Sequence, residues 1–287
     1  MSISPSTPIA PAATNNSSPP KPHERRWSLA RFMPVMELEL IAFWQLKSGL
    51  IVDLLVGPIV YFALFAAGVG GVISSAVNGD GNAGTSASDY LNFVVPGFLV
   101  LQGFNTFSRS IFRATIDRRW GLLALKRLLG TGGLAYVLAM MVVPIINFLA
   151  KSVAITIIAL ILGVRMQPLP FLGAILLTCV LLTFWTTLAI LITAWISNYE
   201  QRDIMMGLLI LPMTFGAPVF YSLDTAPRYL QIIAFCNPLS YQVMAVRNVY
   251  NGENPGWWLI ATLGATAAIV IAAFRSVTRG ELLGKEG

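Results

Sequence analysis

Long apolar runs separated by short polar stretches dominate the hydropathy pattern of this chain. Six runs approach the ~20 residues that a helix needs to cross a bilayer, and they lie at about 50–77, 91–112, 132–161, 171–196, 204–221 and 257–274. The polar stretches between them predict connections at 78–90, 113–131, 162–170, 197–203 and 222–256. The pattern therefore predicts an all-α membrane protein with six transmembrane helices.

The ends of the chain differ from this pattern. Residues 1–27 begin with a stretch rich in Ser, Pro, Thr, Ala and Asn, which predicts a disordered cytosolic tail. Residues 28–48 mix apolar positions with Arg31, Glu37, Glu39 and Lys47, and this mixture favours a helix that lies in the interface plane. We expect residues 28–280 to form the transmembrane domain and 281–287 a second cytosolic tail.

Composition and charge support a membrane protein and give it an orientation. Hydrophobic residues make up 56% of the chain, charged residues 11%, and the mean hydropathy is +0.71, far from the balance of a soluble domain. The net charge of +6 comes from cations that flank the spans, so we do not expect nucleic-acid binding. Nearly all cations fall on one side, whereas Arg165, Arg228 and Arg247 fall on the other. This asymmetry predicts a multi-pass protein of the inner (plasma) membrane with both termini in the cytosol.

A basic segment from Arg113 to Gly130 interrupts the apolar runs. It carries Asp117 and five cations, which are Arg113, Arg118, Arg119, Lys126 and Arg127. Ionised groups are expensive in hydrocarbon, so the segment is expected to lie in water. Leu122, Leu125, Leu128 and Leu129 recur at helical spacing, which predicts a short amphipathic helix. Two interpretations remain open: a basic surface resting on anionic lipid, or a docking lever for a cytosolic protein.

Polar side chains within the spans form a second group of candidates. Gln102, Asn105 and Arg109 share one helical face, and Lys151 follows Asn147 by one turn. Together with Asn92, these side chains either join neighbouring helices or line a transport pathway.

The fifth run carries Gly207, Pro212, Gly216 and Pro218, which predicts that its end is broken. The stretch that follows, 222–256, is too polar to cross the bilayer and too apolar for a free loop. We expect it to form short helices that dip into the outer leaflet, acting either as a structural cap or as a gate.

The sequence has few residues in the patterns that catalysis or metal binding requires. Cys179 and Cys236 have no metal-ligand spacing, and His23 lies in the polar tail. A phosphate loop of the pattern Gly-x-x-x-x-Gly-Lys-Ser/Thr does not occur in these 287 residues. We therefore expect no catalytic residue, cofactor site or metal site in this chain.

The order of these features resembles a known family. The pieces are Asp117-Arg118-Arg119-Trp120-Gly121 followed by Leu125-Lys126-Arg127-Leu128, the broken stretch 212–221, and Asn237-Pro238-Leu239-Ser240-Tyr241 followed by Arg247. Over residues 28–275 they look like the permease subunit of type 2 ABC (ABC-2) exporters, a group that includes daunorubicin-resistance and polysaccharide-export permeases. The chain departs from the family pattern at Thr131-Gly132-Gly133, where members often have Thr-Pro followed by an apolar residue.

The resemblance implies a role for each piece. Residues 28–48 would be the connecting helix, and the basic segment would be the coupling helix, whose Arg113, Asp117, Arg118, Arg119, Gly121, Leu125, Lys126 and Arg127 would serve the ATPase contact. External re-entrant helices would contain Pro212, Gly216, Pro218, Asn237, Pro238, Tyr241 and Arg247. The implied partners are a cytosolic ATPase dimer, which would hold ATP and Mg, a second permease that is identical or different, and membrane lipid.

The leading hypothesis is therefore an ATP-driven exporter of an amphipathic drug or lipid. Export of a lipid-linked polysaccharide or other glycan is the alternative, because aromatic residues in the second run could stack on sugars. A proton-coupled secondary transporter is a remote third alternative. Such a transporter needs a relay of ionisable residues inside the spans, and Asp53 and Lys151 do not form one.

Overall fold

The computed structural model describes residues 33, 36–37, 41, 56–60, 87–122, 125–126, 133–196 and 198–279. Most of the predicted connecting helix and of the first predicted span lie outside these residues, as do both predicted tails. Within the described residues, the secondary structure is helical and contains no strand.

Four long helices form a bundle: α3 (Ala87–Arg119), α5 (Gly133–Ile161), α6 (Pro168–Ile192) and α10 (Gly256–Arg279). Three described segments are long and apolar enough to cross a membrane, namely Ala135–Ile161, Pro168–Ile192 and Gly256–Val277. Three further helices are α7 (Tyr199–Gly216), α8 (Arg228–Cys236) and α9 (Pro238–Tyr250). The six-span topology stays a prediction.

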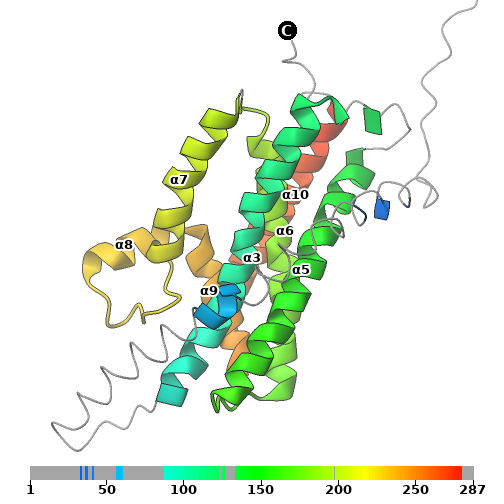
Figure 1. Cartoon of the computed structure of the whole chain (residues 1–287). Helices are drawn as coiled ribbons and strands as arrows, with labels where there is room; N and C mark the ends of the chain where they lie inside the picture. Colours follow the sequence, from blue (N-terminus) through cyan, green and yellow to red (C-terminus); the bar gives the residue numbers. More distant parts are fainter. Residues whose placement is uncertain are drawn as a thin grey trace, which may run out of the picture.

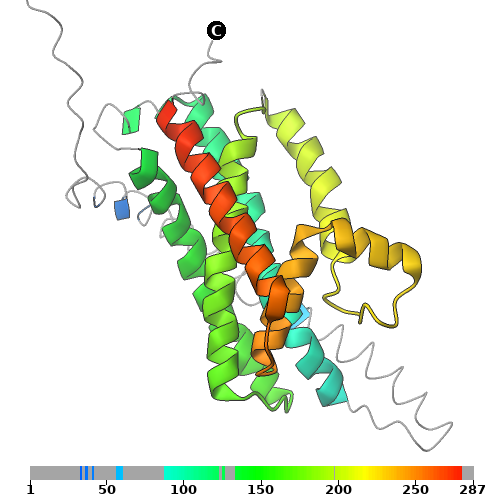
Figure 2. The same cartoon turned by 180° about the vertical axis from the view of Figure 1, so that it is seen from behind.

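Helix α6 occupies the centre of the bundle, because it packs against α3, α5, α9 and α10 (Figure 1). The view from behind shows α10 and α5 alongside α6 (Figure 2). The bundle has two ends. At the first, here called the Asp117 end, α3 and α10 finish and α5 and α7 begin. At the other, the Arg247 end, α3 and α10 begin and α9 closes the fold.

Aromatic residues fix the centre of the core. The ring of Phe104 on α3 meets Trp185 on α6 edge to face, with 4.6 Å between ring centroids. The indole nitrogen of Trp185 donates to Gln242 Oε1 on α9 at 2.8 Å, so the buried indole loses no hydrogen bond. Gly103 lets α3 approach α6 closely, since a Cβ there would lie 3.2 Å from Thr178 Cγ2. These contacts hold α3, α6 and α9 as one packed unit.

Local signals set the helix ends. Helix α3 continues seven residues past the predicted limit at 112. Charged residues mark the end of the membrane-embedded part, but the helix itself can continue into water. Helix α7 begins at Tyr199, within the predicted loop 197–203, because the side chain of Asn198 accepts a hydrogen bond from Gln201 N and caps the first turn. At the start of α6, Pro168 occupies the first turn, where the missing N–H is not needed.

Candidate functional site

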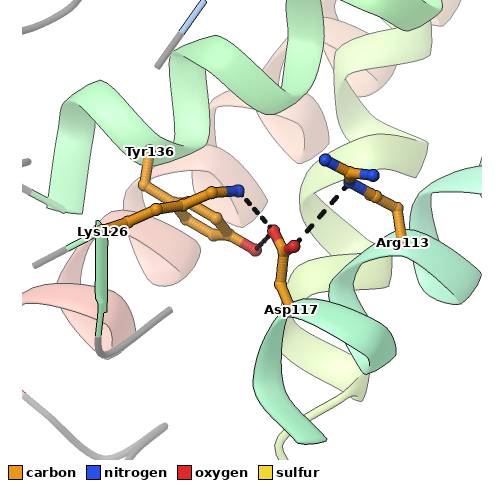
Figure 3. Close-up of polar contacts among 4 residues, drawn as sticks. All are labelled: Arg113, Asp117, Lys126 and Tyr136. Carbon is orange, nitrogen blue, oxygen red and sulfur yellow. Dashed lines mark hydrogen bonds and ion pairs between the residues drawn. The ribbon is translucent and has the colours of Figure 1, made fainter. Parts of the chain in front are cut away.

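Asp117 is the centre of a buried polar cluster near the end of α3. Its side chain is fully buried, and Lys126 Nζ donates to Oδ2 at 2.7 Å. The hydroxyl of Tyr136 donates to the same oxygen at 3.4 Å, and Arg113 Nε lies 3.8 Å from Oδ1 (Figure 3). One carboxylate therefore gathers two cations and a phenol, which together offset the cost of burying its charge.

The Asp117 cluster joins separate parts of the chain. Asp117 and Arg113 belong to α3, Lys126 lies in the segment that follows it, and Tyr136 belongs to the first turn of α5. Lys126 Nζ also lies 5.3 Å from the centre of the Tyr136 ring, a cation–π distance. Apolar residues from α3, α5, α6 and α10 pack beside the cluster; they include Ala114, Val137, Met140, Met141, Ile190 and Val277. A displacement of Lys126 would therefore directly change its contacts with Asp117 on α3 and Tyr136 on α5.

A second set of contacts ties the end of α3 to the α6–α7 connection. A guanidinium nitrogen of Arg118 donates to the carbonyl of Thr193, which caps α6. Trp120 Nε1 donates to the Tyr199 hydroxyl at 3.1 Å, and Arg119 Cζ lies 5.0 Å from the centre of the same ring. From α7, Arg202 Cζ reaches that ring at 5.1 Å. Tyr199 thus ties the start of α7 to the end of α3.

Gly121 ends α3. Its φ of 66° is a left-handed conformation that glycine adopts without a Cβ penalty. A new helical turn starts directly after it, with Leu125 N donating to Gly121 O at 3.0 Å. This turn brings Lys126 back toward Asp117.

The structure corrects one expectation for the basic segment and places one of its predicted contact residues. Residues 113–119 are the last turns of α3 and do not belong to a separate amphipathic helix, because the chain breaks only at Gly121. Lys126, which the resemblance assigns to the ATPase contact, points inward to Asp117 and is 7% exposed. Its contact with an ATPase stays a prediction. Arg127 lies outside the described residues.

Apolar side chains on the segment that ends α3 are exposed. Trp120 is 72% exposed and Leu125 is 51% exposed. Leu125 was among the residues predicted to contact an ATPase, whereas Trp120 was not. A large aromatic residue directly after two arginines, at the end of an apolar run, is the signal that would have identified it.

Arg247 organises the opposite end of the bundle. Its Nη2 atom donates to the carbonyl of Pro218 at 2.8 Å and to that of Val219 at 3.3 Å, and Cζ lies 3.9 Å from the centre of the Phe93 ring. Burial lowers the pKa of Arg247 to about 10, so the guanidinium remains charged at neutral pH. Because Val219 also lies against Gly97 of α3, Arg247 fixes the chain after α7 onto the bundle.

The predicted break after the fifth apolar run is confirmed. Helix α7 contains Pro212 and ends at Gly216, and Pro218 lies in the turn that follows. Gly216 faces α8 closely, since a Cβ there would come within 2.7 Å of Ile233.

Asn237 and Pro238 form the corner between α8 and α9. Asn237 donates to Met213 O at 2.8 Å and caps α9 by accepting from Leu239 N at 2.9 Å. Pro238 begins α9. Tyr241 donates to Phe235 O at 2.8 Å across the same corner. These contacts join α7, α8 and α9, while the depth of the two short helices in a membrane remains a prediction.

The polar residues of the predicted spans lie between packed helices. Lys151 Nζ on α5 lies 3.4 Å from Gln102 Oε1 on α3, and Asn105 Nδ2 lies 3.4 Å from the same oxygen. Asn92 accepts a hydrogen bond from the hydroxyl of Tyr250 on α9. Asn147 is partly buried. Apart from Asn147, each of these side chains has a partner on its own or a neighbouring helix, which is how polar groups join membrane helices.

The fold defines a class: a helical membrane protein with a buried ion-pair cluster at one end of its bundle and an arginine-anchored helix corner at the other. The sequence profile of the ABC-2 type transporter family matches residues 32–251, most of the chain. The chain belongs to the ABC-2 type transporter family.

Two relatives carry names that describe transport. A protein named as a transport permease, ycf38, from Cyanophora paradoxa is 25% identical over 178 residues, which cover 61% of this chain and 60% of the relative. The daunorubicin resistance ABC transporter permease protein DrrB1 from Streptomyces coeruleorubidus is 22% identical over 236 residues, covering 79% of this chain and 77% of the relative. The match to ycf38 therefore spans less than two thirds of that relative's length.

Proposed function

We propose that this chain is the membrane-spanning subunit of an ATP-driven exporter and that the Asp117 end faces the cytosol. The family assignment supports a transport subunit rather than an enzyme. The excess of cations at this end supports the orientation, since positively charged segments are retained in the cytosol.

The observation that carries the proposal is the Asp117 cluster. An ATPase that binds the exposed Trp120 and Leu125 would move the turn that holds Lys126. The Lys126–Asp117–Tyr136 contacts would pass this movement to α3 and α5, and the contacts of Arg118 and Trp120 would pass it toward α6 and α7. ATP and Mg would bind to the partner ATPase. Binding of ATP would shift the permease between two conformations. The size of this shift would be set by how much more tightly the ATP-bound ATPase binds one conformation than the other.

The proposed cargo is an amphipathic drug or lipid, and the assembly contains two ATPases and a second permease. The name of the Streptomyces coeruleorubidus relative supports a drug-like cargo. The identity of the second permease, the same chain or another, is left open by the proposal.

Reconstitution separates this function from that of a self-sufficient transporter. We expect the purified chain in liposomes to hydrolyse no ATP and to move no amphipathic dye. Addition of the ABC ATPase that co-purifies with the chain from its native membrane is expected to produce ATP-dependent dye movement. Transport driven by a proton gradient in liposomes that hold this chain alone would contradict the proposal.

A further inference from the structure

A pocket of about 410 Å³ opens at the Arg247 end of the bundle, far from the Asp117 cluster. The stretch between α7 and α8, the helices α8 and α9, and the start of α10 supply its lining residues. The side chains that determine its chemistry are Asp224, Gln231, Phe235, Ser240, Tyr241 and Trp258. Its volume lies in the range of sites that take small organic molecules.

Two polar groups of this pocket, the Gln231 amide oxygen and the Asp224 carboxylate, can only accept hydrogen bonds. Gln231 Nε2 donates to the carbonyls of Leu223 and Ala226 at 3.1 and 3.0 Å. Only the amide nitrogen can donate to carbonyls, so the orientation of this amide is fixed and its Oε1 is left as an acceptor. Asp224 adds a carboxylate that forms no salt bridge with any described residue. None of the described residues that line the pocket is a lysine, arginine or histidine.

One buried polar atom in the wall lacks a partner. Ser240 is only 2% exposed, and its Oγ atom makes no hydrogen bond within the described part of the chain. Buried hydroxyls are normally paired, so an unpaired hydroxyl lining a pocket points to a ligand that completes it.

Aromatic rings complete the wall. The Tyr241 and Trp258 rings meet edge to face with centroids 5.4 Å apart, and Phe235 lies 6.1 Å from Tyr241. The hydrogen bond from the Tyr241 hydroxyl to Phe235 O holds the ring in place. The faces of such rings carry negative potential and attract organic cations.

We propose that this pocket binds an organic cation, a protonated or quaternary amine carried on an apolar body. A carboxylate, a free amide oxygen and aromatic faces all favour a positive head group, whereas an anionic ligand would meet the Asp224 carboxylate and no cationic side chain among the described lining residues. The apolar body would lie on Phe235, Tyr241 and Trp258. Binding at this pocket goes beyond the proposed export function and does not require the ATPase.

Calorimetric titration of the purified full-length chain in nanodiscs tests the proposal, with benzyltrimethylammonium as the probe. Asp224→Asn keeps the shape of an exposed side chain and removes its charge, and we expect it to weaken binding about fivefold, since exposed charge pairs are modest in strength. Glu253→Gln is the matched control, because Glu253 is an exposed acid near the same end that does not line the pocket. This variant is expected to bind like the unmodified chain. As a second variant, Tyr241→Leu is expected to weaken binding by removing an aromatic face.

Three results would overturn the proposal. The first is the absence of a binding signal with benzyltrimethylammonium, and the second is equal affinity in the Asp224→Asn variant and the unmodified chain. The third is that the chain binds maltose but not the cation, and that Tyr241→Leu weakens maltose binding. That result would identify a glycan site. None of these results bears on ATP-dependent transport, so the proposed function can stand or fall separately.

Discussion

At the scale of single residues, the charge of Asp117 dominates the account. A fully buried carboxylate is tolerated only with close partners, because removal from water costs several kcal/mol per ion. Lys126, Arg113 and Tyr136 supply these partners from three different positions along the chain. A change to one member should therefore leave another buried group without its partner.

Replacing Asp117 by Asn is expected to destabilise the fold by roughly 3–5 kcal/mol, the range for removal of one partner from a buried ion pair. The ammonium of Lys126 would then remain buried without its carboxylate. The double variant Asp117→Asn/Lys126→Met is expected to recover part of this loss, because it removes the stranded charge as well. Unfolding of the detergent-solubilised chain measures both effects.

The control for this cycle is Asp203→Asn. Asp203 forms an ion pair with Arg202 at 2.8 Å, but its side chain is 66% exposed, so we expect a loss below about 1 kcal/mol. Equal losses for Asp117→Asn and Asp203→Asn, or strictly additive effects in the double variant, would contradict the role assigned to the Asp117 cluster.

The sequence predicted part of this cluster. It showed that Asp117 is the one acid among five cations between Arg113 and Gly130. Helical spacing placed Lys126 on a polar face, but spacing cannot say whether that face meets water or a buried acid. The pairing depends on the left-handed turn at Gly121, which reverses the chain toward α5. A glycine in the sequence does not by itself predict a left-handed turn, because glycine also occurs at many positions in this chain that have other conformations.

At the scale of helices, the broken end of α7 shows how the fold replaces lost helical hydrogen bonds. Helix α7 ends at Gly216, and the backbone that follows presents its carbonyls to side chains of other helices. Arg247 takes the carbonyls of Pro218 and Val219, and the hydroxyl of Tyr221 donates to Gly216 O at 2.9 Å. Irregular backbone at this position is therefore satisfied by protein.

Arg247→Met is expected to loosen the turn after α7. The two carbonyls would lose a charged donor, at a cost of roughly 2–3 kcal/mol, because methionine fills similar volume without donating. Hydrogen exchange at the Val219 amide, which donates to Ala217 O at 2.8 Å, reports the loosening. Arg247→Lys is expected to rescue little, since one ammonium cannot reproduce the planar contact with both carbonyls and Phe93.

Arg228→Met provides the comparison for Arg247→Met, because Arg228 is an exposed arginine of the neighbouring α8. It is expected to leave exchange at Val219 unchanged. Slow exchange preserved in the Arg247→Met variant would show that other contacts hold the turn.

The sequence predicts where helices lie along the chain, but it predicts the residues at which they begin and end less well. Apolar runs located α5, α6 and α10 well, and the prolines and glycines of the fifth run located the end of α7. Charged residues predict a loop at 197–203, but α7 begins within it at Tyr199, because Asn198 followed by Gln201 has the spacing of a helix cap. The mutual placement of α7, α8 and α9 could not be predicted, because it depends on long-range bonds from Asn237 and Arg247.

At the scale of the whole molecule, the two ends of the bundle differ in chemistry. The Asp117 end collects cations, a buried acid and exposed apolar side chains, whereas the Arg247 end has a carboxylate, an amide oxygen and aromatic rings around a pocket. Helices α3 and α6 run between the ends and pack tightly along their length. In the proposed assembly, a partner acts at the first end and its effect travels through these helices.

The most direct test of this account is co-purification of the ABC ATPase with the chain after Trp120→Ala/Leu125→Ala substitution. Both residues are exposed, so their replacement should leave the fold intact. Trp257→Ala is the matched control, because this tryptophan is 52% exposed at the Arg247 end. We predict at least a tenfold loss of bound ATPase for the double variant and no loss for the control. Full retention of the ATPase by the double variant would contradict the claim that the end of α3 receives the partner.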